Sequence, residues 1–241
     1  MSPNNIPHLQ IQKQLMKEAL YGCAICGCPI VEYVNIVPYD GNAQAFLPEN
    51  MLVLCPSHYI AYSNHRGISE SALRDAKNNP HNKVHQEDAF IVPSQDFAII
   101  MGKCKFINTS RILVIDDFDI ISIKREEGKY ILLDINFFDK INNLIAIVSG
   151  NSWTAEKSDS WTINYKAKHL TIQNQSKNTI FEAKIQDINN EITIIADGMY
   201  YNRSAIKITE HQILLNGEEI ALDLKDTELK NYEVGIEAET L

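Results

Sequence analysis

The sequence predicts an α+β protein in which a helical, metal-binding part is followed by an all-β part. Two short Cys/His pairs lie before residue 60 at metal-ligand spacing, and short apolar runs alternate with turn residues from Phe97 onward. With 241 residues and 45% hydrophobic content, the chain is long enough to bury a substantial core. The composition shifts near residues 80–93, where we place the boundary between the two parts.

The first part is expected to mix helices and loops. Apolar residues recur at helical spacing over residues 9–21, and Gly22 follows as a natural stop. A second helix is expected over residues 70–78, with Ser69 as its N-cap. The polar stretch over residues 80–86 is interpreted as a linker.

The second part changes to the period of β-strands. Turn pairs such as Glu127-Gly128 and Asp197-Gly198 separate its apolar runs. This pattern is typical of an antiparallel sandwich, a barrel or a short β-solenoid, and the lack of an exact repeat favours the sandwich-like arrangement. The predicted strands are Ala98–Met101, Arg111–Ile115, Ile120–Ile123, Tyr130–Asp134, Leu144–Val148, Leu170–Ile172, Ile192–Ile195 and Ile213–Leu215.

Charge and composition exclude some function classes. The net charge is −9, and neither part has a basic excess, so tight DNA binding by the isolated chain is not favoured unless a local patch or a second protein supplies it. No apolar run is long enough to cross a bilayer, and the N-terminus lacks the pattern of a secretory signal. We therefore expect a cytoplasmic protein with reduced thiols and no membrane role.

The two short pairs predict a zinc site. Cys23-Ala-Ile-Cys26 and Cys55-Pro-Ser-His58 offer the four thiolate and imidazole ligands that zinc prefers in a tetrahedron. The alternative is that these cysteines are small core residues, but the glycine and prolines beside both pairs favour tight turns. Cys28 is interpreted as a buried neighbour of the site or, alternatively, as a substitute ligand.

Four segments together carry a family resemblance. The runs Tyr21–Gly27, Asn35–Pro38, Pro48–His58 and Gly67–Ser69 resemble the HNH endonucleases in order and spacing, over roughly residues 15–85. The resemblance implies two strands and a helix around a divalent ion, with a structural zinc held by two short ligand pairs. It also implies a general-base histidine at the end of the first strand, an asparagine that holds the loop and a metal-binding histidine on the helix.

Two of these three catalytic positions are changed in this chain. The general-base position holds Asn35, whose amide cannot accept a proton near neutral pH, and the metal-binding position holds Tyr59, a poor ligand for a hard cation. The loop asparagine is retained as Asn50. A relocated site could draw on His65, Glu32 or Asp40, although each is interpreted as a solvated surface group.

We divide the chain into three segments: an HNH-like zinc domain over residues 1–85, a β-rich domain over residues 86–225 and an acidic tail over residues 226–241. The β-rich part resembles a domain that follows the HNH part in some bacterial proteins, and its tryptophans Trp153 and Trp161 are read as core anchors or as a binding surface.

Two functions follow. The favoured one is a catalytically degenerate HNH-like zinc protein that acts as a recognition, scaffold or regulatory subunit, in a setting such as bacterial defence. It would meet a protein partner or a second copy of itself through the β-rich domain. The alternative is an active DNA endonuclease that uses Mg²⁺ or Mn²⁺.

Overall fold

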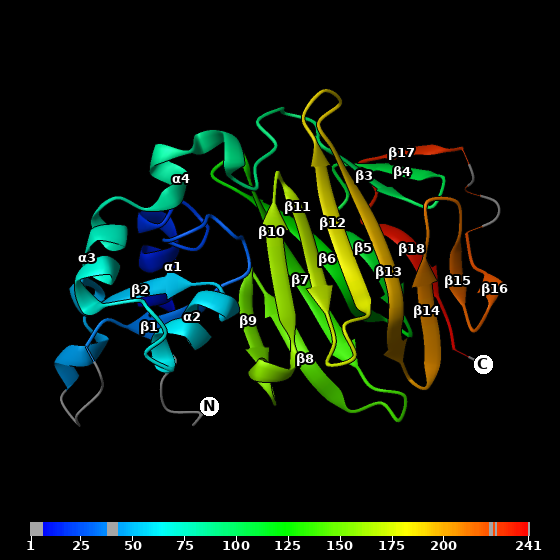
Figure 1. The fold of residues 1–241 in the computed structure, drawn as a ribbon. Coiled ribbons are helices and arrows are strands. Elements are labelled where there is room, and N and C mark those ends of the chain that lie inside the picture. Colours follow the sequence, from blue (N-terminus) through cyan, green and yellow to red (C-terminus); the bar gives the residue numbers. More distant parts are fainter. Residues whose placement is uncertain (1–6, 38–42, 222–223, 225, 241) are drawn as a thin grey trace.

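The computed structural model describes residues 7–37, 43–221, 224 and 226–240. Its α-helices lie in the first third of the chain, and strands fill most of the remainder (Figure 1). The expectation of a mixed chain dominated by β-structure is therefore confirmed. Within the described ranges, none of the helices is both long and apolar enough to span a bilayer.

The helices are α1 (Leu9–Glu18), α2 (Pro56–Ser63), α3 (Glu70–Asn78) and α4 (His81–Val84), with short 3₁₀ turns η2 (Ala43–Phe46), η3 (Pro48–Asn50), η4 (Gln86–Asp88) and η5 (Ser158–Ser160). The strands are β1 (Glu32–Asn35), β2 (Met51–Leu54), β3 (Ala98–Met101), β4 (Cys104–Ile107), β5 (Arg111–Ile115), β6 (Phe118–Glu126), β7 (Tyr130–Phe138), β8 (Leu144–Ser149), β9 (Ser152–Ala155), β10 (Thr162–Lys166), β11 (His169–Gln173), β12 (Thr179–Gln186), β13 (Glu191–Tyr201), β14 (Ser204–Ile208), β15 (Ile213–Leu215), β16 (Glu218–Glu219), β17 (Glu228–Lys230) and β18 (Val234–Ala238).

The helices of the first part begin and end for identifiable reasons. Ser69 caps α3 as expected, because its hydroxyl accepts a hydrogen bond from the amide of Ala72 at 3.2 Å. The first helix is shorter than its periodicity predicts. It ends at Glu18 because Leu20 and Tyr21 take left-handed backbone angles, with φ of 51° and 58°.

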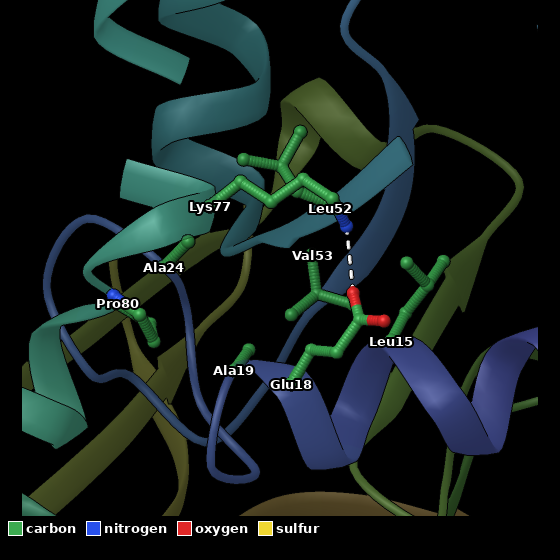
Figure 2. A pocket seen from close by; sticks show the side chains of 8 residues that line it. All are labelled: Leu15, Glu18, Ala19, Ala24, Leu52, Val53, Lys77 and Pro80. Atoms are coloured by element: carbon green, nitrogen blue, oxygen red, sulfur yellow. Dashed lines mark hydrogen bonds and ion pairs between the residues drawn. The ribbon is translucent and has the colours of Figure 1, made fainter. Parts of the chain in front are cut away.

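One lysine ties three elements of this part together. Lys77 of α3 donates hydrogen bonds to Glu18 Oε2 of α1 at 2.6 Å and to the carbonyl of Met51 in β2 at 2.8 Å. Figure 2 shows the Lys77–Glu18 pair at the rim of a small apolar cavity between α1 and β2. The cavity measures about 10 Å³, which is too small for a ligand. It is a packing feature and no candidate site.

The prediction of a linker over residues 80–86 is wrong, because this segment is structured. It forms α4 and leads into η4, and Asn82 within it is only 2% exposed. Asn82 Nδ2 donates to the carbonyl of Leu20 at 3.0 Å, so α4 packs on the turn that follows α1. Gly27 permits this approach, since a Cβ there would lie 2.4 Å from Asn82 Oδ1. His85 is exposed, whereas His81 is half-buried, with its Nε2 3.0 Å from Asp88 Oδ2.

The β-rich part is a 16-stranded sheet that turns back on itself into two facing layers (Figure 1). One layer contains β10 to β13 in order, and the other contains β9, β8, β7, β6, β5 and β18. Aromatic side chains fill the space between the layers, with Phe137 of β7 edge-on to Phe181 of β12 at 6.4 Å. The Asp197-Gly198 pair, expected as a turn, is instead a register shift inside β13.

The C-terminal segment over residues 226–241 is not a free acidic tail. Among its described residues, β17 pairs in parallel with β4, and β18 pairs in parallel with β5. Ile236 of β18 is 2% exposed and belongs to the common core. The segment alternates charged and apolar residues, so burial of one face explains why it folds into the sheet.

The N-terminal part covers the edges of the two β layers. Val31, just before β1, forms a bridge to Ser152 and accepts a hydrogen bond from the amide of Trp153 at 2.7 Å. On the other layer, Ser57 of α2 donates to the carbonyl of Ile163 in β10 at 3.4 Å. Figure 1 shows β1 and α2 beside β9 and β10. Because exposed strand edges invite pairing with other chains, this arrangement protects both edges.

Candidate metal centre

One tight turn and one helix start bring four candidate ligands together. Cys23 and Cys26 lie in the turn after α1, closed by a hydrogen bond from the amide of Gly27 to the carbonyl of Cys23 at 2.8 Å. Cys55 follows β2 as the N-cap residue of α2, and Pro56 at the first helical position fixes the turn of the chain. His58 therefore lies on the first turn of α2, facing the Cys23–Cys26 turn.

The geometry of the four side chains fits a metal ion. Their ligand atoms all lie within 4.8 Å of one another. Cys26 and Cys55 Sγ are 3.8 Å apart, and His58 Nδ1 lies 3.5 Å from Cys23 Sγ and 3.2 Å from Cys55 Sγ. A tetrahedral zinc ion with Zn–S bonds of about 2.3 Å and Zn–N bonds of about 2.0 Å places sulfurs about 3.8 Å apart. Cys23, Cys26, Cys55 and His58 thus form a potential metal site consistent with structural zinc.

The electrostatics of the cluster favour a cation. Burial opposes ionisation of Cys23, but hydrogen bonds with Cys26, Cys55 and His58 outweigh it and hold the pKa of this thiol well below its usual range. The hydrogen bond with Cys23 raises the pKa of the Cys26 and Cys55 thiols and of His58. The negative charge of the Cys23 thiolate is thus stabilised by hydrogen bonds with Cys26, Cys55 and His58. A bound cation would displace the remaining thiol protons, so binding would release protons to solvent.

Cys28 is a neighbour of the site and lies outside the four-ligand cluster. Its Sγ donates to the carbonyl of Ile30 at 3.6 Å, and the residue is 2% exposed. Burial raises the pKa of this thiol. Both features favour the interpretation of Cys28 as a buried neighbour over that of a substitute ligand.

The three positions that the resemblance singles out lie around the β1–β2 hairpin and α2. β1 and β2 pair antiparallel, with Asn35 opposite Met51 at the end of the hairpin, and α2 follows directly. Asn50 Nδ2 donates to the carbonyl of Gln44 at 2.9 Å, which connects η3 to η2. Tyr59 is half-buried in α2, one residue beyond the ligand His58.

The two described side chains considered for a relocated active site, His65 and Glu32, belong to no potential metal-binding group among the described residues. His65 is exposed and lies past the end of α2, with a left-handed φ of 54°, so the helix does not carry it onto the face of His58. Asp40 lies outside the described residues. Glu32 was expected at the surface, but it is 3% exposed.

The burial of Glu32 is the main site feature that sequence reasoning missed. Glu32 shares the buried face of β1 with Val34. Ser158 donates a hydrogen bond of 3.4 Å to Glu32 Oε1 and accepts one from Trp153 Nε1 at 3.2 Å. Burial raises the pKa of Glu32 to about 7, against the smaller effect of the Ser158 hydrogen bond. The signal available in the sequence was the alternation of side chains along a strand, which puts Glu32 on the same face as apolar Val34.

The two tryptophans are packing residues of the same region. Trp153 is 3% exposed and contacts half-buried Trp161, with ring centroids 5.3 Å apart. Phe137 completes the cluster from β7. This favours core anchors over a binding surface.

Comparison of the chain with known protein families, with curated proteins and with solved structures gives no match.

Proposed function

We propose that this chain is a catalytically degenerate HNH-like zinc protein that acts as a recognition, scaffold or regulatory subunit. The observation that carries the proposal is the combination of the four-ligand cluster with an antiparallel β1–β2 hairpin that leads directly into α2. In this arrangement the positions that the family uses for its chemistry hold Asn35 and Tyr59. An asparagine amide is no general base, and a neutral phenol binds Mg²⁺ or Mn²⁺ poorly.

Zinc has a structural role in this proposal. Cys23, Cys26, Cys55 and His58 would supply all four ligands of a zinc tetrahedron, whereas catalytic zinc sites keep one position open for water or substrate. The ion would hold the turn after α1 against the first turn of α2. Its removal would therefore affect folding and the docking of α2 on β10.

Metal content tests the structural half of the proposal. Native mass spectrometry of protein purified without added metal is expected to show one zinc ion per chain. Cys26→Ser should lower that occupancy, and Cys104→Ser, which changes a buried thiol outside the cluster, should leave it unchanged. Full occupancy in Cys26→Ser would contradict the ligand assignment.

A nuclease assay tests the catalytic half. Plasmid and single-stranded DNA incubated with the zinc-loaded protein and Mg²⁺ or Mn²⁺ are expected to remain intact. Metal-dependent cutting that disappears in Asn50→Ala would show an active endonuclease and overturn the proposal. A second test is the double variant Asn35→His with Tyr59→His, in which gain of cutting would support the family assignment of these two positions.

A further inference from the structure

A second candidate site lies in the β-rich part, where three turns meet. They are the loop between β7 and β8, the turn between β13 and β14 and the turn between β15 and β16. A cavity of about 550 Å³ opens between them, and none of its described lining residues belongs to the proposed zinc module. The lining residues are Ile141, Asn142, Asn202, Arg203, Ser204 and Asn216.

Hydrogen bonds hold the three turns together and leave amide atoms unused. Asn142 Oδ1 accepts from the amide of Asn202 at 2.6 Å, which ties the β7–β8 loop to the β13–β14 turn. Asn216 Oδ1 accepts from the amide of Ala205 at 2.9 Å, which ties the β15–β16 turn to β14. Asn202 Nδ2 also donates, but Asn142 Nδ2 and Asn202 Oδ1 have no hydrogen-bond partner among the described residues. The exposed amides of Asn142 and Asn202 therefore offer one donor group and one acceptor to a ligand.

Arg203 occupies a position that the turn itself disfavours. Asn202 and Arg203 are the two central residues of the β13–β14 turn, with φ of 47° and 67°, and such turns prefer glycine at the second position. The neighbouring β15–β16 turn has the preferred pair, Asn216 and Gly217. Arg203 is exposed, and its guanidinium has neither a hydrogen-bond nor an ion-pair partner within the described part of the chain. Unfavourable backbone conformations cluster at ligand sites, so a bound ligand would explain an arginine here.

The charges around the cavity disfavour an ionic ligand. Arg203 is the one charged side chain among the described lining residues. Hydrogen bonds from Thr240 and from the backbone of Asn143 hold the pKa of Asp116 and Asp139, respectively, below their usual range. Asp116 hydrogen-bonds Asn202, so its charged carboxylate lies beside the site. An anion would meet these carboxylates, and a cation would meet Arg203. The other charged residues within two positions of these groups along the chain are Asp117, Lys140, Glu218 and Glu239.

We propose that this cavity binds a neutral saccharide of one or two sugar units. A hydroxyl group both donates and accepts hydrogen bonds, so sugar hydroxyls accept from Asn142 Nδ2 and from the Arg203 guanidinium and donate to Asn202 Oδ1. An anion, which only accepts, would leave Asn202 Oδ1 without a donor. Ile141, which is 71% exposed, offers an apolar contact to the C–H groups of a sugar ring. The cavity volume lies within the range of about 300–1,000 Å³ for small-molecule sites.

Saturation-transfer NMR on the zinc-loaded full-length chain tests this assignment. The probes are glucose, galactose, mannose, N-acetylglucosamine, maltose, cellobiose and lactose. Each is added at about 5 mM, enough to fill most of a site with a Kd of about 1 mM. At least one saccharide is expected to receive saturation from the protein, and the anions acetate and methyl phosphate are expected to receive none. Absence of transfer to every saccharide, or stronger transfer to either anion, would overturn the proposal.

Matched variants locate the binding. Arg203→Gly removes the guanidinium and introduces the residue that the turn prefers, so the fold is retained and the affinity is expected to fall about tenfold. Asn142→Asp keeps the acceptor for the Asn202 amide, removes the unused N–H groups and should also weaken binding. Lys177→Gly is the control, because Lys177 is an exposed basic residue with a φ of 63° outside the cavity. Unchanged affinity in Arg203→Gly, or an equal loss in Lys177→Gly, would overturn the site.

Discussion

Glu32→Gln is expected to abolish a large pH-dependent loss of stability. Glu32 is 3% exposed, its Oε1 accepts one long hydrogen bond from Ser158, and its Oε2 has no partner among the described residues. Burial raises its pKa from 4.5 to about 7. The folded protein therefore keeps the proton on Glu32 across a range of pH in which the unfolded chain has released it.

The sign and size follow from proton linkage. Between about pH 4.5 and pH 7 the unfolded state binds fewer protons at this site, so the free energy of unfolding falls as the pH rises. The stabilising contribution of the protonated carboxyl is complete below the unfolded pKa and is lost as the pH rises through the folded pKa. A shift of this size corresponds to about 3 kcal/mol in all.

Urea unfolding of both proteins, followed by circular dichroism from about pH 5 to pH 8.5, measures this difference. The free energy of unfolding of Glu32→Gln relative to wild type is expected to rise by about 2.5 kcal/mol over that range. Titration of the metal ligands occurs in both proteins and cancels. The matched control is Glu156→Gln, the same change at an exposed position. Parallel pH profiles for wild type and Glu32→Gln would refute the reasoning.

Three further predictions concern the β-rich part and its contact with the metal centre. Asn151→Ala is expected to lower the free energy of unfolding, measured in urea, by about 2–4 kcal/mol, because buried Asn151 hydrogen-bonds the backbone of Leu133 and Ile131 and has a φ of 69°. The control is exposed Asn142, which has a similar φ of 71°. An equal loss of stability in Asn142→Ala would contradict the role of the buried hydrogen bonds. Phe137→Ala should cost about 3–5 kcal/mol in the same assay, and a loss below about 1 kcal/mol would contradict its place between the layers. Removal of bound metal with a chelator should increase self-association in analytical ultracentrifugation, and a purely monomeric metal-free protein would argue against the edge-covering role of α2.

The sequence predicts local features of this protein well. All eight apolar runs lie in strands, and the two Cys/His pairs come together because their spacing matches a turn and a helix start. Ser69 caps α3, since an N-cap depends only on residues within one turn. These features are set by neighbours in the chain, which is why a single sequence reveals them.

Features that depend on distant contacts were missed. The sequence alone predicts that the residues of β18 belong to an acidic tail. Their pairing with β5, more than a hundred residues earlier, is a distant contact that the local sequence does not show. The polar residues 80–86 resemble a linker because nothing local shows that Asn82 packs against the turn after α1. The register shifts between β5 and β6 depend on how the two strands pair, so neither strand shows them alone.

The metal centre and the β-rich part share one helix, and this links their stabilities. Ser57 lies between the ligands Cys55 and His58, and its hydroxyl reaches the carbonyl of Ile163 in β10. β10 is the last strand of its layer, so the first turn of α2 covers a strand edge. A metal ion that holds this turn in place would therefore also hold α2 over the edge of β10. Because an uncovered edge offers unpaired backbone groups to other chains, metal loss would expose an association surface as well as loosen a fold.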